Sequence, residues 1–101
     1  MVRVDWAQPA LDDLQEIYEF IARDSPRYAQ LTVERITNVA GHLARFPQLG
    51  EFLSEFSHLA YRQMVVGAYR LIYREDSETN RVIVMGVIHG SRDLPPILEN
   101  R

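Results

Sequence analysis

Residues 81–89 read Arg-Val-Ile-Val-Met-Gly-Val-Ile-His, and apolar side chains stand at odd and even positions alike. Successive side chains of a strand point to opposite faces of a sheet, so such a run is typical of a strand that is buried on both faces. The polar stretch 75–80 precedes the run, and Gly90 follows it. We therefore expect 81–89 to form a central strand.

Two more strands are expected immediately before this one. From Leu59 onward the apolar residues recur with a period of two, which predicts strands over 59–66 and 69–74. Gly67-Ala68 is typical of a tight turn between them. The three successive strands should pair as an antiparallel meander, whereas residues 51–58 are expected to be irregular.

The first half of the sequence is expected to be helical after one short strand. Residues 2–6 alternate apolar and charged side chains, which predicts a strand at or near an edge of the sheet. A first helix should open at residues 7–9 and end near Arg23. Ser25 as N-cap and Pro26 in the first turn then predict a second helix, which runs to about Arg45.

The predicted order of elements is β-α-α-β-β-β within one domain that covers residues 1–101. The connection between the helices is so short that they must be antiparallel neighbours, an αα-hairpin. Because helices and strands are segregated along the chain, the expected fold class is α+β, with an antiparallel sheet and the αα-hairpin packed on one face.

The composition excludes several kinds of site. The chain contains no cysteine, which excludes a disulfide framework, a Cys-ligated metal and a thiol nucleophile. No metal-ligand spacing such as H-E-x-x-H occurs, and we expect neither a metal nor a cofactor. No apolar run is long enough for a signal peptide or a membrane span, which predicts a cytoplasmic protein without a membrane partner. The net charge of −3 argues against a general nucleic-acid binder.

All 11 basic residues are arginines, so cationic chemistry falls to guanidinium groups, which bind anions but rarely transfer protons. Arg62, Arg70 and Arg74 lie on two strands that are expected to pair, and no acidic residue occurs between them. Such a cluster can hold a phosphate backbone or an acidic peptide. It can equally be an ordinary solvated sheet face on which arginine stems cover apolar surface.

Three further residues are candidates for acid–base chemistry. His89 lies at the end of the predicted central strand, where it can be a general acid or base, or a structural histidine. Glu51 and Glu55 precede the sheet. They can supply a base or form a solvated, anionic rim.

Five short motifs are spread over nearly the whole chain. They are Asp13-Leu14-Gln15-Glu16-Ile17-Tyr18 with Phe20-Ile21-Ala22, Ser25-Pro26-x-x-Ala29, Phe46-Pro47-x-x-Gly50, Tyr69-Arg70-Leu71-Ile72-Tyr73, and Val87-Ile88-His89-Gly90-x-Arg92-Asp93. In their order and spacing they resemble the RelE/ParE toxins. The β-α-α-β-β-β order is also the fold of that family.

The resemblance implies the toxin of a type II toxin–antitoxin module. Its partner would be a ParD-like antitoxin, a ribbon-helix-helix or similar DNA-binding protein that wraps the toxin with a segment that folds on binding. The toxin would reach DNA only through this antitoxin. The apolar helix stripes and the free sheet edge are the expected docking surfaces. The stripe residues are Leu14, Ile17, Tyr18, Ile21, Val33 and Ile36.

The resemblance also implies one of two activities. RelE-like toxins cut mRNA in the ribosomal A site, whereas ParE-like toxins block DNA gyrase and trap it on cleaved DNA. Arg70 matches the RelE arginine that contacts the scissile phosphate, and Arg92 lies near a second one. However, Met64 stands where many RelE toxins have a lysine, and Pro95-Pro96 stands where a tyrosine is common. The acidic net charge also suits ribosome docking poorly.

The first hypothesis is therefore a ParE-like inhibitor of DNA gyrase that works by binding, with no catalysis of its own. In this hypothesis Arg62, Arg70 and Arg92 contact the target, together with the C-terminal tail.

The alternative hypothesis is a RelE-like, ribosome-dependent mRNA endoribonuclease. Its catalytic residues would be Arg70, Arg92 and His89. Glu51 or Glu55 would then supply the base. A third hypothesis is a non-toxic homologue that is kept for binding its antitoxin or for regulating DNA.

Overall fold

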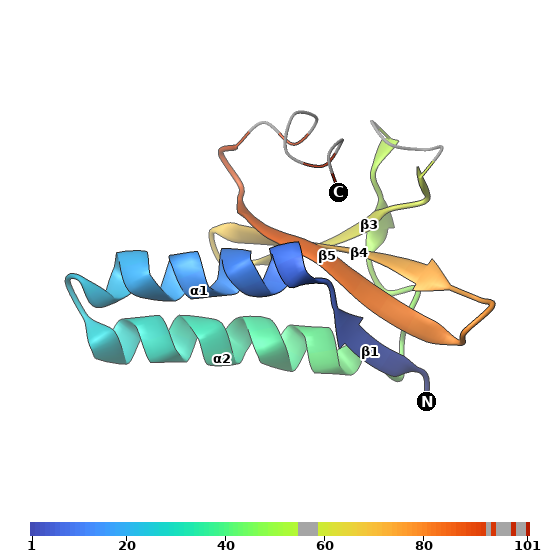
Figure 1. Ribbon diagram of the computed structural model, residues 1–101, viewed down its shortest axis with the longest axis horizontal. Helices are drawn as coiled ribbons and strands as arrows, with labels where there is room; N and C mark the ends of the chain where they lie inside the picture. The colour runs from blue at the N-terminus through green and yellow to red at the C-terminus, as the bar shows by residue number, and fades with distance from the viewer. Residues whose placement is uncertain (55–58, 93, 95–97, 99–100) are drawn as a thin grey trace.

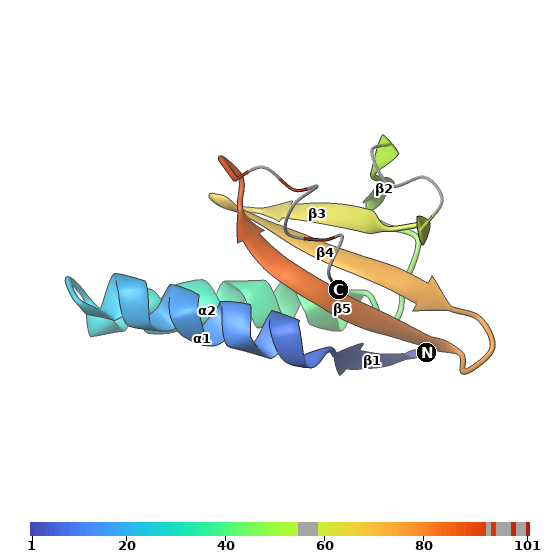
Figure 2. The same ribbon diagram turned by 45° about the horizontal axis from the view of Figure 1, so that its top comes forward.

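The computed structural model describes residues 1–54, 59–92, 94, 98 and 101. Its elements are, in chain order, β1 (Arg3–Trp6), α1 (Gln8–Ala22), α2 (Pro26–His42), β2 (Glu51–Phe52), β3 (Arg62–Val66), β4 (Tyr69–Asp76) and β5 (Arg81–His89). The strands form one sheet in the order β1-β5-β4-β3-β2, in which β1 is parallel to β5 and the other neighbours are antiparallel. Figures 1 and 2 show α1 and α2 side by side on one face of this sheet. The predicted α+β class, meander and helical hairpin are confirmed.

Several boundaries differ from the sequence prediction. The stretch expected to be irregular contains β2, which pairs with the first two residues of β3. β3 begins at Arg62 instead of Leu59, because Ala60 has a φ of 54°, a left-handed conformation that cannot continue a strand. β4 extends to Asp76, since its last two residues pair with the start of β5. α2 ends at His42, and residues 43–45 continue only as a tighter turn.

The hairpin of helices forms as its sequence signals predict. The Ser25 side chain accepts a hydrogen bond from the backbone N–H of Tyr28 (3.1 Å), and Pro26 is the first residue of α2. The backbone N–H groups of Asp24 and Ser25 both donate to the carbonyl oxygen of Ile21. These bonds close the end of α1 and reverse the chain within three residues.

Strand β5 is buried on both faces, and a β-bulge adjusts which side chains face the helices. The pairing with β4 passes over Met85, which is therefore the extra residue of the bulge. As a result, Val84 and Val87 both pack against the helices although they lie three residues apart. Ile88 turns to the opposite face, where Leu94 and Leu98 are buried against the sheet. β5 is thus an internal strand, as predicted, although β4 is the middle strand of the five.

A buried hydrogen bond ties the segment before β2 to the sheet. The backbone N–H of Gly50 donates to the hydroxyl of Tyr73 (2.7 Å), whose side chain is fully buried. A Cβ atom on Gly50 would overlap the ring of Tyr73 and the carbonyl of Gln63, so only glycine fits there. Burial raises the pKa of Tyr73 and keeps its phenol neutral.

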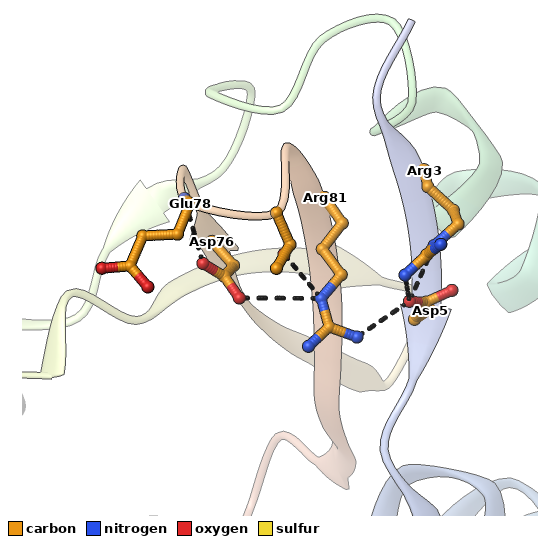
Figure 3. Close-up of polar contacts among 6 residues, drawn as sticks. Arg3, Asp5, Asp76, Glu78 and Arg81 are labelled. Atoms are coloured by element: carbon orange, nitrogen blue, oxygen red, sulfur yellow. Dashed lines mark hydrogen bonds and ion pairs between the residues drawn. The ribbon is translucent and has the colours of Figure 1, made fainter.

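A charged network fixes the register of β1 against β5 (Figure 3). Arg81 Nη1 lies 3.0 Å from a carboxylate oxygen of Asp5, and Arg81 Nε donates to Thr79 Oγ1 at 2.8 Å and lies 3.6 Å from Asp76. Arg3 pairs with the same oxygen of Asp5 at 3.0 Å. Because Arg3 and Arg81 are register partners in the parallel ladder, a slipped register would separate these charges.

We expect Tyr73→Phe to destabilise the fold, because it leaves the buried N–H of Gly50 without an acceptor. The free energy of unfolding should fall by about 1–3 kcal/mol, measured by urea denaturation. Tyr18→Phe is the matched control, since Tyr18 is exposed on α1, and it should change stability by less than about 0.5 kcal/mol. Equal stability of the two variants would contradict the role of the Gly50 bond.

Acid should weaken the network around Arg81. The hydrogen bond from Arg81 lowers the pKa of Asp5, and the hydrogen bond from Thr79 lowers the pKa of Asp76. A carboxyl group with a lower pKa in the folded chain stabilises the fold above its unfolded pKa, and that contribution is lost as the pH falls through its folded pKa. Urea titrations between about pH 5 and pH 2 should therefore show a smaller loss of stability in Arg81→Ala than in the wild type. Parallel curves would rule this out.

Candidate functional site

An open cleft of about 600 Å³ lies between α1 and the end of β5. One wall is the face of α1 that runs from Asp13 to Arg23. The other wall is formed by the end of β5 from Val87 and by the turn that follows it to Arg92, with Tyr69 beside them. Arg101 contributes from the end of the described chain. The cleft therefore combines a helix wall, a strand end and a turn that are distant in the sequence.

An ion pair forms the floor of the cleft. Arg101 binds the carboxylate of Asp13 with both terminal nitrogens, at 2.7 and 2.9 Å. Each side chain is only 15% exposed, so water competes weakly for these bonds. The pair fastens the end of the described chain to α1.

The same two side chains complete the hydrogen bonding of β5. The strand β1 ends at Trp6, so on that side of β5 no strand from the described part of the chain lies beyond Val84. Asp13 accepts a hydrogen bond from the N–H of Val87 (3.0 Å), and Arg101 donates to the carbonyl of Met85 (3.2 Å). A Cβ atom at position 86 would meet the guanidinium of Arg101, so a larger residue there would require that side chain to shift. Side chains thus replace the missing strand.

Arg70 lies half-buried beneath the turn that follows β5. Its Nη2 donates to the carbonyl oxygens of Gly90 (3.4 Å) and Arg92 (3.2 Å), and its Nη1 lies 3.5 Å from Gln63 Oε1. Its buried Nε has no hydrogen-bond partner among the residues that the structure describes. Arg74, on the same strand, is also half-buried. Arg70 therefore holds the turn in place from below, whereas the sequence suggested an open sheet face.

The turn presents Arg92 and His89 to the cleft. Arg92 is exposed, and within the described ranges no ion pair engages its side chain. His89 Nδ1 accepts from the backbone N–H of Ser91 (3.2 Å) and lies 2.7 Å from Ser91 Oγ. The ring of His89 meets that of Tyr69 edge-on, with 5.5 Å between the centroids. Burial raises the pKa of Tyr69, so its phenol stays neutral beside the histidine.

Arg62 does not join this group. Its register partner is Tyr73, which places its side chain on the helix face of the sheet, opposite that of Arg70. Arg62 is 14% exposed, pairs with Glu75 at 3.1 Å, donates to the Gly50 carbonyl at 2.8 Å and lies 3.8 Å from the centre of the Phe52 ring. The three arginines predicted to contact a target are therefore divided between the two faces.

The acid–base candidates lie apart as well. Glu51 is exposed on β2 and His89 ends β5, and two strands separate them in the sheet. At about 4.8 Å between strands, their backbones are at least about 14 Å apart. The predictions for Glu55, Asp93 and 95–97 concern residues outside the described part of the chain.

Most of the helix residues predicted to bind an antitoxin pack inside the chain. Ile17 and Ile36 are buried in the core between helices and sheet, and Leu14 and Ile21 pack against it. Val33 is half-buried. Tyr18 is the member of the set with a large exposed area, at 40%. The apolar stripes thus cover the sheet of their own chain.

Sequence reasoning did not single out four side chains on the α1 wall of the cleft, and it included Arg101 only as part of the C-terminal tail. The four are Glu16, Glu19, Phe20 and Arg23. Sequence reasoning also passed over the structural role of Asp13. A signal for Asp13 existed, because it lies four residues before the buried Ile17 and so falls on the inward face of α1. No comparable signal marks Arg101, whose partner lies 88 positions away.

The described residues give no indication of a metal centre or a membrane helix. In 1–54, 59–92, 94, 98 and 101, no group of three or more His, Cys, Asp or Glu side chains could hold a metal ion. Over the same residues, no helix has both the length and the apolar character to cross a bilayer.

Comparison with known proteins points to toxins of bacterial toxin–antitoxin systems. The model for the ParE toxin of the type II toxin–antitoxin system parDE matches residues 4–94. A solved structure of the RelBE2 toxin–antitoxin complex from Mycobacterium tuberculosis is 30% identical, with a TM-score of 0.61 over 87% of this chain and 96% of that chain. The YoeB/ParE toxin from Agrobacterium tumefaciens is 25% identical, with a TM-score of 0.60 over 86% of this chain and 96% of that chain.

A third structure, of the chromosomal ParDE system from P. aeruginosa, has a TM-score of 0.74 over 88% of this chain and 96% of that chain. Its identity is 18%, so this likeness shows the shared fold alone. No curated protein matches the sequence significantly.

We expect the ion pair between Asp13 and Arg101 to stabilise the fold. Arg101→Ala leaves the carboxylate of Asp13 partly buried without its cation, so the free energy of unfolding should fall by about 3 kcal/mol. Asp13→Asn should lower it by a similar amount, and hydrogen exchange at the Val87 amide should accelerate. Asp12→Asn is the matched control, because Asp12 is exposed one residue away. If Asp13→Asn is as stable as Asp12→Asn in chemical denaturation, the ion pair does not support the fold.

Proposed function

The chain belongs to the ParE toxin family of type II toxin–antitoxin systems, and on this premise we propose that it inhibits DNA gyrase by binding to it. A cognate antitoxin neutralises it. We further propose that the antitoxin is a ParD-like, DNA-binding protein of the ribbon-helix-helix or a similar kind, so that DNA is reached only through it.

The hydrogen bonds that Arg70 donates within the chain are the observation that favours binding over catalysis. An arginine that stabilises a cleaving phosphate needs free, outward donors. The terminal nitrogens of Arg70 donate to two main-chain carbonyls and Gln63, and its Nε is buried. The positions of the candidate general bases do not favour an RNase either. Glu51 and His89 lie on β2 and β5, and two strands separate β2 from β5 in the sheet. We therefore assign Arg70 to positioning, Arg62 to the fold and Arg92 to the contact with the target.

The free edge of the sheet supports the antitoxin part of the proposal. β2 covers only the first two residues of β3, so no strand among the described residues lies beside Met64, Val65 and Val66 on that edge. Val65 is 70% exposed. An extended antitoxin segment can add a strand along this edge. The exposed Tyr18 offers a second contact on the helix side.

A ribosome-dependent mRNA endoribonuclease is the second candidate, because the structure that is 30% identical is a RelBE2 complex. This candidate would use the exposed Arg92 and His89. A non-toxic binding homologue is the third.

A paired assay on the purified protein, free of antitoxin, tests the proposed function. One half measures the supercoiling of relaxed plasmid by gyrase, and the other half measures the integrity of a defined mRNA during translation. We expect loss of supercoiling with trapped cleaved DNA, and intact mRNA. Cleaved mRNA with normal supercoiling would replace the proposal by the second candidate, and no effect in either half would favour the third.

A further inference from the structure

Each wall of the α1–β5 cleft carries an exposed arginine. Arg23 stands at the C-cap of α1, and Arg92 stands in the turn after β5. Both are exposed, and neither forms an ion pair with any described residue. This contrasts with Arg101 in the same cleft, which is fully engaged with Asp13.

An exposed aromatic ring accompanies these free cations. Phe20 lines the cleft and is 67% exposed, and the guanidinium of Arg23 lies 5.9 Å from the centre of its ring. Ile17 and Val87 add an apolar base between the walls. Arginine and aromatic residues are enriched at protein–protein interfaces, and a few such residues often supply most of the binding energy.

The acidic residues of the cleft favour a protein over a nucleic acid. Glu16 and Glu19 line the α1 wall, whereas Asp13 is neutralised by Arg101. A phosphate backbone carries a charge at every nucleotide and would meet both glutamates. A protein segment can instead place one carboxylate opposite Arg23 and another opposite Arg92, and keep uncharged atoms beside the glutamates.

We propose that the α1–β5 cleft is the target-binding surface, and that it takes a protein segment with an apolar side chain against Phe20 and acidic side chains opposite Arg23 and Arg92. Arg70 acts indirectly, because it fixes the turn that carries Arg92. This inference rests on the proposed function, since the segment is taken to belong to DNA gyrase. It adds Phe20 and Arg23 to the contact and removes Arg62 from it.

Three variants and one control test the proposal. Arg23→Ala, Arg92→Ala and the double variant remove the free cations, and Arg27→Ala removes an exposed arginine of α2 that does not line the cleft. All should keep the wild-type unfolding midpoint within about 3 °C, because the changed side chains are on the surface. Each purified protein is titrated into a gyrase supercoiling assay.

We expect each single variant to need about tenfold more protein for half-inhibition, and the double variant about a hundredfold more. Arg92→Lys should recover part of the loss, since it keeps the charge. Arg27→Ala should inhibit like the wild type.

Other results separate the inference from the function on which it rests. If the double variant inhibits gyrase as well as the wild type does, the cleft is not the contact surface, although the proposed function stands. If the wild type itself leaves gyrase active, the proposed function fails and the inference fails with it. If the double variant loses affinity for a fluorescent single-stranded RNA and keeps its effect on gyrase, the cleft binds nucleic acid and the proposal is overturned.

Discussion

The backbone of β5 continues past the end of β1, so its N–H at Val87 and its carbonyl at Met85 face an edge where the described residues place no neighbouring strand. Buried backbone groups without partners cost as much as a lost hydrogen bond, and a second strand is the usual remedy. Here Asp13 and Arg101 supply the partners from opposite ends of the chain. This arrangement draws α1 against the strand end and creates the cleft beside it.

The structure also shows why a chain without lysine can be rich in internal contacts. A guanidinium group offers five donors in a plane, and one side chain can hold several oxygens at once. Arg62 joins Glu75 to the Gly50 carbonyl, Arg70 holds two carbonyls of one turn, and Arg101 grips a carboxylate with two nitrogens. Other arginines are exposed and remain available to a partner, and two of them, Arg23 and Arg92, line the cleft.

Local patterns predicted the fold well, because period, caps and turn residues act over a few positions. The strand over 81–89 has the predicted bounds, and Ser25 caps α2 as predicted. The site was harder to predict, because it depends on which residues share a face. Arg62 falls opposite Arg70 through the register of β3 against β4, which the sequence pattern does not fix. Arg101 finds its partner only through the tertiary fold.

The parallel pairing of β1 with β5 has a consequence for the order of folding. Arg3 meets Arg81 roughly eighty residues later in the chain, whereas β3, β4 and β5 pair with near neighbours in sequence. Closing so long a loop is slow, and local hairpins form first. On the ribosome, β1 must therefore wait until β5 has emerged. A nascent chain with this topology cannot complete its sheet from the first four strands alone.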